Sequence, residues 1–164
     1  MIKNAKSAAT QHKPIGRALL RSAAALLVVA ALAAPASARP FQQYLNGLCG
    51  ATICKINFAK VPAGQRLLVN DVSCYVSLTT ASGNFGLRAM QLLVLGANPN
   101  NVLSAVTLVP DYTGSNSTDV NYAANSTISA FANAQQRFQA YVEITAGTFS
   151  QVACHISGNL VKAT

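Results

Sequence analysis

Apolar and polar residues alternate along most of the chain after residue 50, and no long stretch keeps a helical period. Period-two alternation sends successive side chains to opposite faces of a β-strand, so the pattern predicts strands. The segments between them are rich in Gly, Pro, Asn and Ser, which form turns. The predicted strands span residues 52–59, 65–78, 85–97, 102–109, 122–132, 137–145 and 149–161.

Two of these strands carry more specific expectations. The Leu-rich segment 85–97 suits a helix or a buried strand, and the flanking Gly86 and Gly96 favour the strand. In segment 65–78, Asn70-Asp71 disfavours strand structure and predicts a β-bulge. The apolar residues of that segment are expected to share one face, namely Leu68, Val72, Cys74, Val76 and Leu78.

The remaining segments are polar or mixed. Residues 41–50 are expected to hold one short helical turn, 110–121 a polar loop, and Asn133-Ala134-Gln135 a hairpin turn. About seven or eight strands with turns every 8–15 residues are typical of an antiparallel β-sandwich, of which the jelly roll is one form. We therefore expect an all-β, jelly-roll-like sandwich.

The N-terminal segment has the pattern of a secretory signal peptide. Five of the twelve Lys and Arg residues lie within the first 21 residues, and the uncharged run 22–34 (SAAALLVVAALAA) follows. Residues 35–38 (PASA) supply a cleavage site of small residues. The apolar run is shorter than the roughly 20 residues that span a bilayer. We expect cleavage after Ala38 and a secreted or periplasmic protein. The alternative is a leader that stays uncleaved, which would be the only expected contact with a membrane.

Cleavage changes the charge of the chain. The formal net charge of +8 falls to +3, because residues 39–164 hold seven Lys and Arg against four Asp and Glu. The seven cations are scattered and form no cluster that would follow a phosphate backbone, so nucleic acid is not an expected partner. The 126 remaining residues contain no repeat or linker and suffice for a single β-sandwich domain, 39–164.

The four cysteines, at 49, 54, 74 and 154, all follow the cleavage site. An even number in an oxidising compartment predicts two disulfides, for which three pairings exist. Alternation places Cys74 and Cys154 on the core faces of long strands, so they can meet if those strands are neighbours or face each other. We predict Cys74–Cys154, with Cys49–Cys54 as a local bridge.

Metal and cofactor chemistry has little support. A zinc site made of cysteines and His155 is the alternative to disulfides, but Cys154 and His155 are consecutive on a strand and point to opposite faces. Segment 110–121 holds four oxygen donors without the spacing of a calcium loop, namely Asp111, Asn116, Asp119 and Asn121. We expect no metal and no cofactor.

No catalytic motif is present. The sequence lacks Gly-x-Ser-x-Gly, His-Glu-x-x-His and phosphate-binding glycine patterns, so no catalytic residue is assigned. His155 is the one histidine of residues 39–164, and a hydrolase that uses it is the least favoured function.

A polar face follows if segments 137–145 and 149–161 form a hairpin around residues 146–148. Gln139 would then lie opposite His155, and Glu143 opposite Gln151. The resulting platform, which Tyr141 completes, suits a sugar or another polar surface, although a solvated sheet face has the same pattern. This candidate binding face comprises Gln139, Tyr141, Glu143, Gln151 and His155.

Two stretches resemble a known group of proteins. Residues 61–74 (VPAGQRLLVNDVSC) and 154–161 (CHISGNLV) are similar to small secreted β-sandwich proteins of soil bacteria, in which a PAGxRL strand leads to a Cys and a CxISGxLV strand ends the chain. The resemblance covers about 22 of 126 residues. It supports the strands and the Cys74–Cys154 pairing, and it implies no activity.

The sequence therefore predicts a non-enzymatic, exported β-sandwich that acts as a binding or surface-interaction module. A polysaccharide or a cell-envelope surface is the expected kind of partner. A structural subunit of a fimbria-like or coat assembly, which shares the size, leader and early disulfide, is the main alternative.

Overall fold

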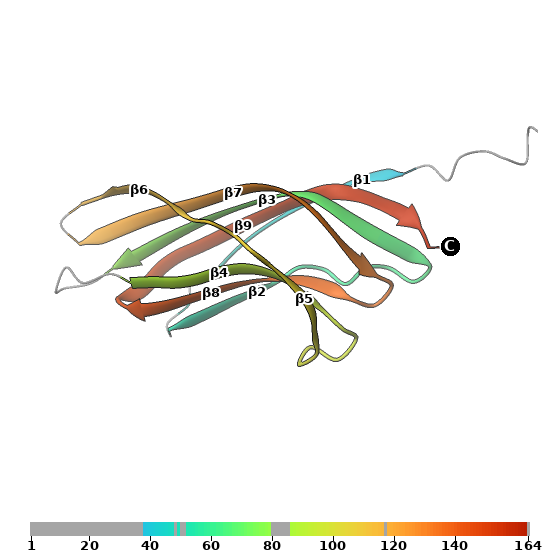
Figure 1. Ribbon diagram of the computed structural model, residues 1–164, viewed down its shortest axis with the longest axis horizontal. Coiled ribbons are helices and arrows are strands. Elements are labelled where there is room, and N and C mark those ends of the chain that lie inside the picture. Colours follow the sequence, from blue (N-terminus) through green and yellow to red (C-terminus); the bar gives the residue numbers. More distant parts are fainter. Residues whose placement is uncertain (1–37, 48, 50–51, 80–85, 117, 164) are drawn as a thin grey trace, which may run out of the picture. The chain divides into compact units, whose positions relative to one another are not determined.

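The computed structural model describes residues 38–47, 49, 52–79, 86–116 and 118–163. Within them the protein is all-β, and its strands form two antiparallel sheets that lie one above the other (Figure 1). Sheet A has the order β1-β9-β3-β7-β6, and sheet B has the order β2-β8-β4-β5. The strands are β1 (Arg39–Gly47), β2 (Ile53–Asn57), β3 (Gln65–Thr79), β4 (Gly86–Leu95), β5 (Val102–Thr107), β6 (Asp111–Ser115), β7 (Asp119–Asn133), β8 (Arg137–Ala146) and β9 (Thr148–Lys162).

The strand pairing is that of a jelly roll, as the sequence predicts. β1 pairs with β9, β2 with β8, β3 with β7 and β4 with β5, so the pairs nest around the β4–β5 connection. Successive pairs belong alternately to sheet A and sheet B, which winds one long antiparallel ribbon into two layers. β6 is an addition, joined to the outer edge of β7 as a hairpin.

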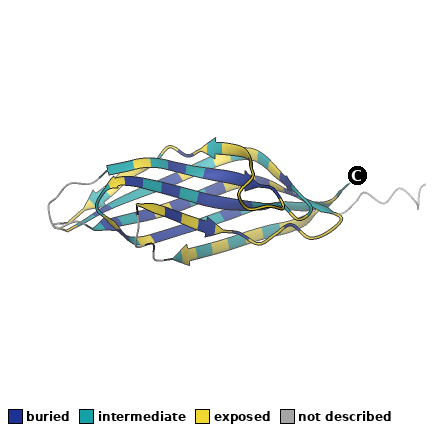
Figure 2. Ribbon diagram, turned by 90° about the horizontal axis from the view of Figure 1, so that it is seen from below, coloured by how far each residue is buried: buried dark blue, intermediate teal, exposed yellow. Residues whose placement is uncertain are grey.

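The hydrophobic core fills the space between the sheets. Figure 2 shows buried positions alternating with exposed ones along the strands, as expected for sheets with one face on a core. The largest fully buried side chains come from both sheets and from the connections, and they include Phe58, Phe138, Leu67, Met90, Leu92 and Ile156.

Both predicted disulfides are present. Cys74 and Cys154 are direct partners in the β3–β9 ladder, with 4.1 Å between their Cα atoms, and both side chains are buried. Cys49 and Cys54 form the local bridge, with Cα atoms 5.3 Å apart. All four thiols are therefore used, which contradicts the zinc alternative. The two bridges indicate an oxidising extracellular or periplasmic environment.

Two strands were not expected from the pattern. The helical turn predicted for 41–50 is wrong, because β1 covers most of that segment. Gln43 interrupts its apolar alternation, and the side-chain oxygen of Gln43 accepts a hydrogen bond from the Ala59 N–H (2.9 Å). The loop predicted for 110–121 is also wrong, because it contains β6 and the start of β7. β6 is a polar edge strand, and such strands lack the alternation of buried ones.

The predicted bulge is confirmed, but its effect on the pattern is larger than expected. Both ladders of β3 shift register between Val69 and Asp71. The extra residue reverses the alternation, so Leu67 and Val69 are buried while Leu68 is 37% exposed. The expected placement of Leu68 on the face of Cys74 is therefore wrong.

The predicted hairpin of the last two strands is wrong as well. β8 pairs with β2 and β4 in sheet B, whereas β9 pairs with β1 and β3 in sheet A. The chain crosses between the layers at Gly147, whose φ of 87° suits glycine. The turn at Asn133–Gln136 likewise joins the two sheets. Alternation specifies which side of a strand faces the core. It does not specify whether two such strands are neighbours in one sheet or face each other across the core, because the pattern is the same in both arrangements.

The expected leader, residues 1–38, lies outside the described residues except for Ala38, and so do residues 80–84, between the predicted strands 65–78 and 85–97. In the part that is described, no helix has the length and hydrophobicity needed to cross a bilayer.

Candidate functional site

A cavity of about 540 Å³ lies on the outer face of sheet B, the face turned away from sheet A. We call it the sheet B cavity. All four strands of sheet B and the β4–β5 loop contribute to it, and the loop lies below the lower layer in Figure 1. Its lining residues are Lys55, Asn57, Leu93, Leu95, Pro99, Asn100, Val102, Arg137, Gln139 and Tyr141.

The apolar part of the lining consists mainly of two leucines outside the core. Leu93 and Leu95 alternate with core residues of β4 and so point away from sheet A, yet they are 8% and 0% exposed. The loop 96–101 is closed by a hydrogen bond from the Gly96 N–H to the Asn101 carbonyl oxygen (2.8 Å), and its residue Pro99 lines the same cavity. The loop thus covers apolar surface on the outside of the sheet.

A pair of amides lies beside the leucines. Gln139 on β8 is the register partner of both Asn57 on β2 and Leu93 on β4. The Gln139 Nε2 donates a hydrogen bond to the Asn57 Oδ1 (2.8 Å), which fixes the orientation of both side chains. Within the described residues, the Gln139 oxygen and the Asn57 NH₂ group are thereby left as an acceptor and a donor for a ligand.

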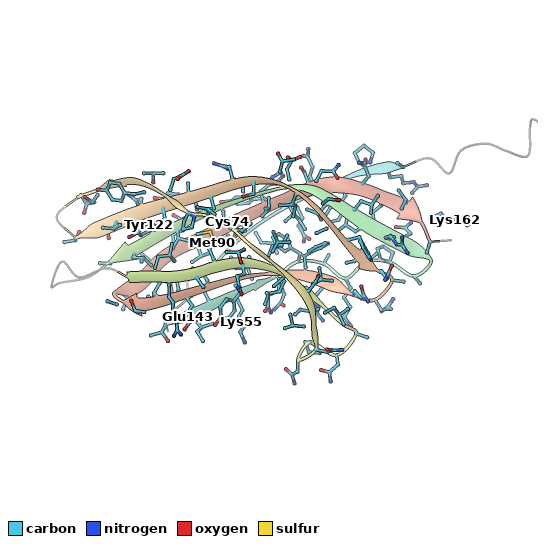
Figure 3. All side chains as sticks on the ribbon, viewed as in Figure 1. Lys55, Cys74, Met90, Tyr122, Glu143 and Lys162 are labelled. Atoms are coloured by element: carbon cyan, nitrogen blue, oxygen red, sulfur yellow. A yellow bond between two sulfur atoms is a disulfide. The ribbon has the colours of Figure 1, made fainter. Side chains whose placement is uncertain are left out.

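Tyr141 lies one row further along the sheet, with Lys55 and Gln91 as register partners. Its hydroxyl donates to the Glu143 Oε2 (3.1 Å), and the Glu143 Oε1 is 2.8 Å from the Arg88 Nη1. Desolvation first, and then the hydrogen bond to Glu143, raise the pKa of the Tyr141 phenol. The hydrogen bond to Glu143 fixes the orientation of the phenol. Figure 3 shows Glu143 and Lys55 on the same outer face.

The predicted binding face is divided between the two sheets. Gln139 and Tyr141 line the sheet B cavity, and Glu143 lies next to it on β8. Gln151 and His155 are on β9 in sheet A, so they lie on the opposite side of the sandwich. The five residues cannot form one surface, because the hairpin that would join them does not exist.

His155 belongs to a polar face of sheet A. A cavity of about 220 Å³ includes His155, Ser73 and Asp71, a set with the side chains of a hydrolytic triad. The Ser73 hydroxyl, however, donates to the Asn125 Oδ1 (2.5 Å), and the Asp71 carboxylate accepts bonds from the Thr127 and Ser157 hydroxyls. These bonds do not align a nucleophile, a base and a carboxylate.

Two of the four oxygen donors of segment 110–121, Asn116 and Asp119, form hydrogen bonds in the turn between β6 and β7. The Asn116 Oδ1 accepts from the Thr118 and Asp119 N–H groups (2.8 and 2.7 Å). Hydrogen bonds from Thr79 and then from Asn116 lower the pKa of the Asp119 carboxyl. Among the described residues, no group of three or more His, Cys, Asp or Glu side chains is arranged to hold a metal.

Several lining residues were not predicted from the sequence. Lys55 and Asn57 reach the cavity through the β2–β8 pairing, which links segments about 80 residues apart, and Arg137 reaches it through the β4–β8 pairing. One signal was available: residues 92–95 (LLVL) are apolar at every position, so both faces of that strand had to be covered.

Comparison with known proteins adds no identification. No protein-family model matches this chain, and no curated protein matches it.

Proposed function

We propose that the protein is an exported, non-enzymatic binding module whose ligand is a saccharide of a polysaccharide or of a cell envelope. The sheet B cavity is the observation that carries this proposal. Its volume of about 540 Å³ falls within the range of roughly 300–1,000 Å³ that is usual for ligand sites. Export rests on the predicted leader and agrees with the two disulfides.

The chemistry of the lining suits a sugar. A pyranose ring has apolar C–H faces and hydroxyl edges, so it needs an apolar or aromatic surface next to amide donors and acceptors. Tyr141 and the exposed Val102 supply the first kind of surface, and the Asn57–Gln139 pair supplies the second. Some jelly rolls are lectin domains, which is an analogy of fold rather than of site.

The scaffold supports the same proposal. The cavity stands on the four strands of one sheet, and a buried bridge ties two strands of the other sheet together. Side chains on such rigid elements need little ordering when a ligand binds, which favours affinity.

The structural-subunit alternative depends on strand exchange between copies. All four jelly-roll pairs are made by strands of this chain, so a borrowed strand would have to add to an outer edge. A monomer that refolds cooperatively on its own would dismiss this alternative. The hydrolase alternative predicts turnover on ester or glycoside panels that His155→Ala abolishes; unchanged turnover in that variant would dismiss it.

The direct test is a glycan and cell-envelope binding array with the purified protein, both disulfides intact. We expect Tyr141→Ala to weaken binding at least tenfold, since buried aromatic contacts dominate small sites. Tyr44→Ala is the matched control, because Tyr44 is 59% exposed on β1 of sheet A. Binding to no glycan or envelope preparation, or loss of binding in Tyr44→Ala alone, contradicts the proposal.

A further inference from the structure

The charged residues that line the sheet B cavity are all positive. Lys55 and Arg137 line it, and no carboxylate is found among its described lining residues. The nearby acid, Glu143, forms an ion pair with Arg88 and accepts the Tyr141 hydroxyl. Its charge is therefore matched locally, and the cavity keeps an excess of positive charge.

Neither cation of the cavity has an ionic partner within the described residues. The single ion pair found there is Arg88–Glu143. Arg137 is half-buried, and its Nε–H group is buried without a hydrogen-bond acceptor. A buried donor without a partner costs free energy, and this donor belongs to a side chain that lines the cavity. The guanidinium geometry matches a carboxylate, which it can bind with two parallel hydrogen bonds.

The positions of the two cations also restrict the ligand. Lys55 is the register partner of Tyr141, and Tyr141 and Arg137 are four residues apart on β8. At about 3.4 Å per residue, the cross-strand row that holds Lys55 and Tyr141 lies roughly 14 Å from the row that holds Arg137. The amide pair and Leu93 lie between them. A ligand that meets both cations must therefore be extended, which a single inorganic anion is not.

We infer that the sheet B cavity binds an acidic oligosaccharide, with a uronate carboxylate on Arg137, a second acidic group near Lys55 and neutral sugar surface on the residues between them. This inference rests on the proposed function and narrows its ligand class. We assign the acidic group at Arg137 as a carboxylate, because the forked donor pattern of an arginine is more specific than the single ammonium group of Lys55.

The experiment is calorimetric titration of the purified, disulfide-bonded protein with uronate oligomers of several backbones, each paired with its methyl ester. The ester keeps the sugar rings and removes the charge. We expect each bound acid to exceed its ester at least tenfold in affinity, and the difference to shrink at high salt. Arg137→Gln should lower the affinity for the acid far more than that for the ester, so that the ratio of the two affinities approaches one. Lys162→Gln is the charge-matched control, on β9 in sheet A (Figure 3), and should change neither.

The outcomes separate the two proposals. Equal binding of acid and ester, with no effect of Arg137→Gln, overturns the acidic ligand and leaves saccharide binding in place. Binding of sulfated oligomers or inorganic phosphate in preference to every uronate also overturns it. Binding of no acid, ester or neutral oligosaccharide overturns this inference together with the proposed function. A thermal unfolding curve of each variant, matching wild type, establishes that the comparison concerns folded protein.

Discussion

The buried bridge between β3 and β9 should stabilise the protein far more than the local bridge near β2. Cys74 and Cys154 are 80 residues apart in sequence, and Cys49 and Cys54 are five apart. In the loop-entropy model, closing the long loop restricts the unfolded chain by about 4.5 kcal/mol at 25 °C, and closing the short loop by about 2 kcal/mol. Cys74→Ala/Cys154→Ala should therefore lower the free energy of unfolding about twice as much as Cys49→Ala/Cys54→Ala.

Urea unfolding followed by circular dichroism measures this difference. With a denaturant dependence of about 2 kcal/mol per molar urea, the midpoint should fall by roughly 2 M for the long bridge and by roughly 1 M for the short one. Loss of the folded state without urea counts as a shift at least as large as expected. Equal shifts, or a larger shift for the Cys49/Cys54 variant, would refute the placement of the long bridge in the central ladder.

Two further predictions concern the bulge and the β6–β7 turn. A Cβ at Gly158 would collide with the Leu68 carbonyl, so Gly158→Ala should lower the free energy of unfolding by about 1–3 kcal/mol. Gly47 has open space around it, so the control Gly47→Ala should change the free energy of unfolding by less than about 0.5 kcal/mol. Equal effects of the two substitutions would contradict the close approach of Gly158 to Leu68. Hydrogen bonds, that from Thr79 first, lower the pKa of Asp119 in the folded protein. The stability that these bonds give is therefore fully present above the ordinary carboxyl pKa of about 3.9, and it is lost as the pH falls through the lower pKa of the folded state. The difference in melting temperature between wild type and Asp119→Asn should thus be largest near neutral pH and vanish in strong acid, whereas a pH-independent difference would contradict it.

Strand identity could be predicted wherever one face of a strand is buried and the other is wet. β2, β8 and β9 followed this rule, and the inward position of Cys74 and Cys154 gave the correct bridge. β1 was missed because Gln43 occupies an inward position with its own hydrogen bond, and Leu68 was misplaced because one bulge residue reverses the alternation.

Sheet membership could not be predicted from the same pattern. An inward-facing β8 is compatible with a hairpin to β9 and with a place across the core from it, and local alternation does not separate these arrangements. The choice depends on long-range pairing of β8 with β2 and β4. The residues of the candidate face are therefore divided: Gln139 and Tyr141 line one cavity, while His155 lies on the other sheet.

The central claim, that the outer face of sheet B is the binding surface, is tested most directly by mapping amide chemical shifts during titration with a bound saccharide. The shifts should concentrate at Lys55, Leu93 and Gln139, which share the cavity, and leave Ser73 and His155 on sheet A unchanged. Shifts that instead centre on Ser73 and His155, or that follow no single face, would contradict the account.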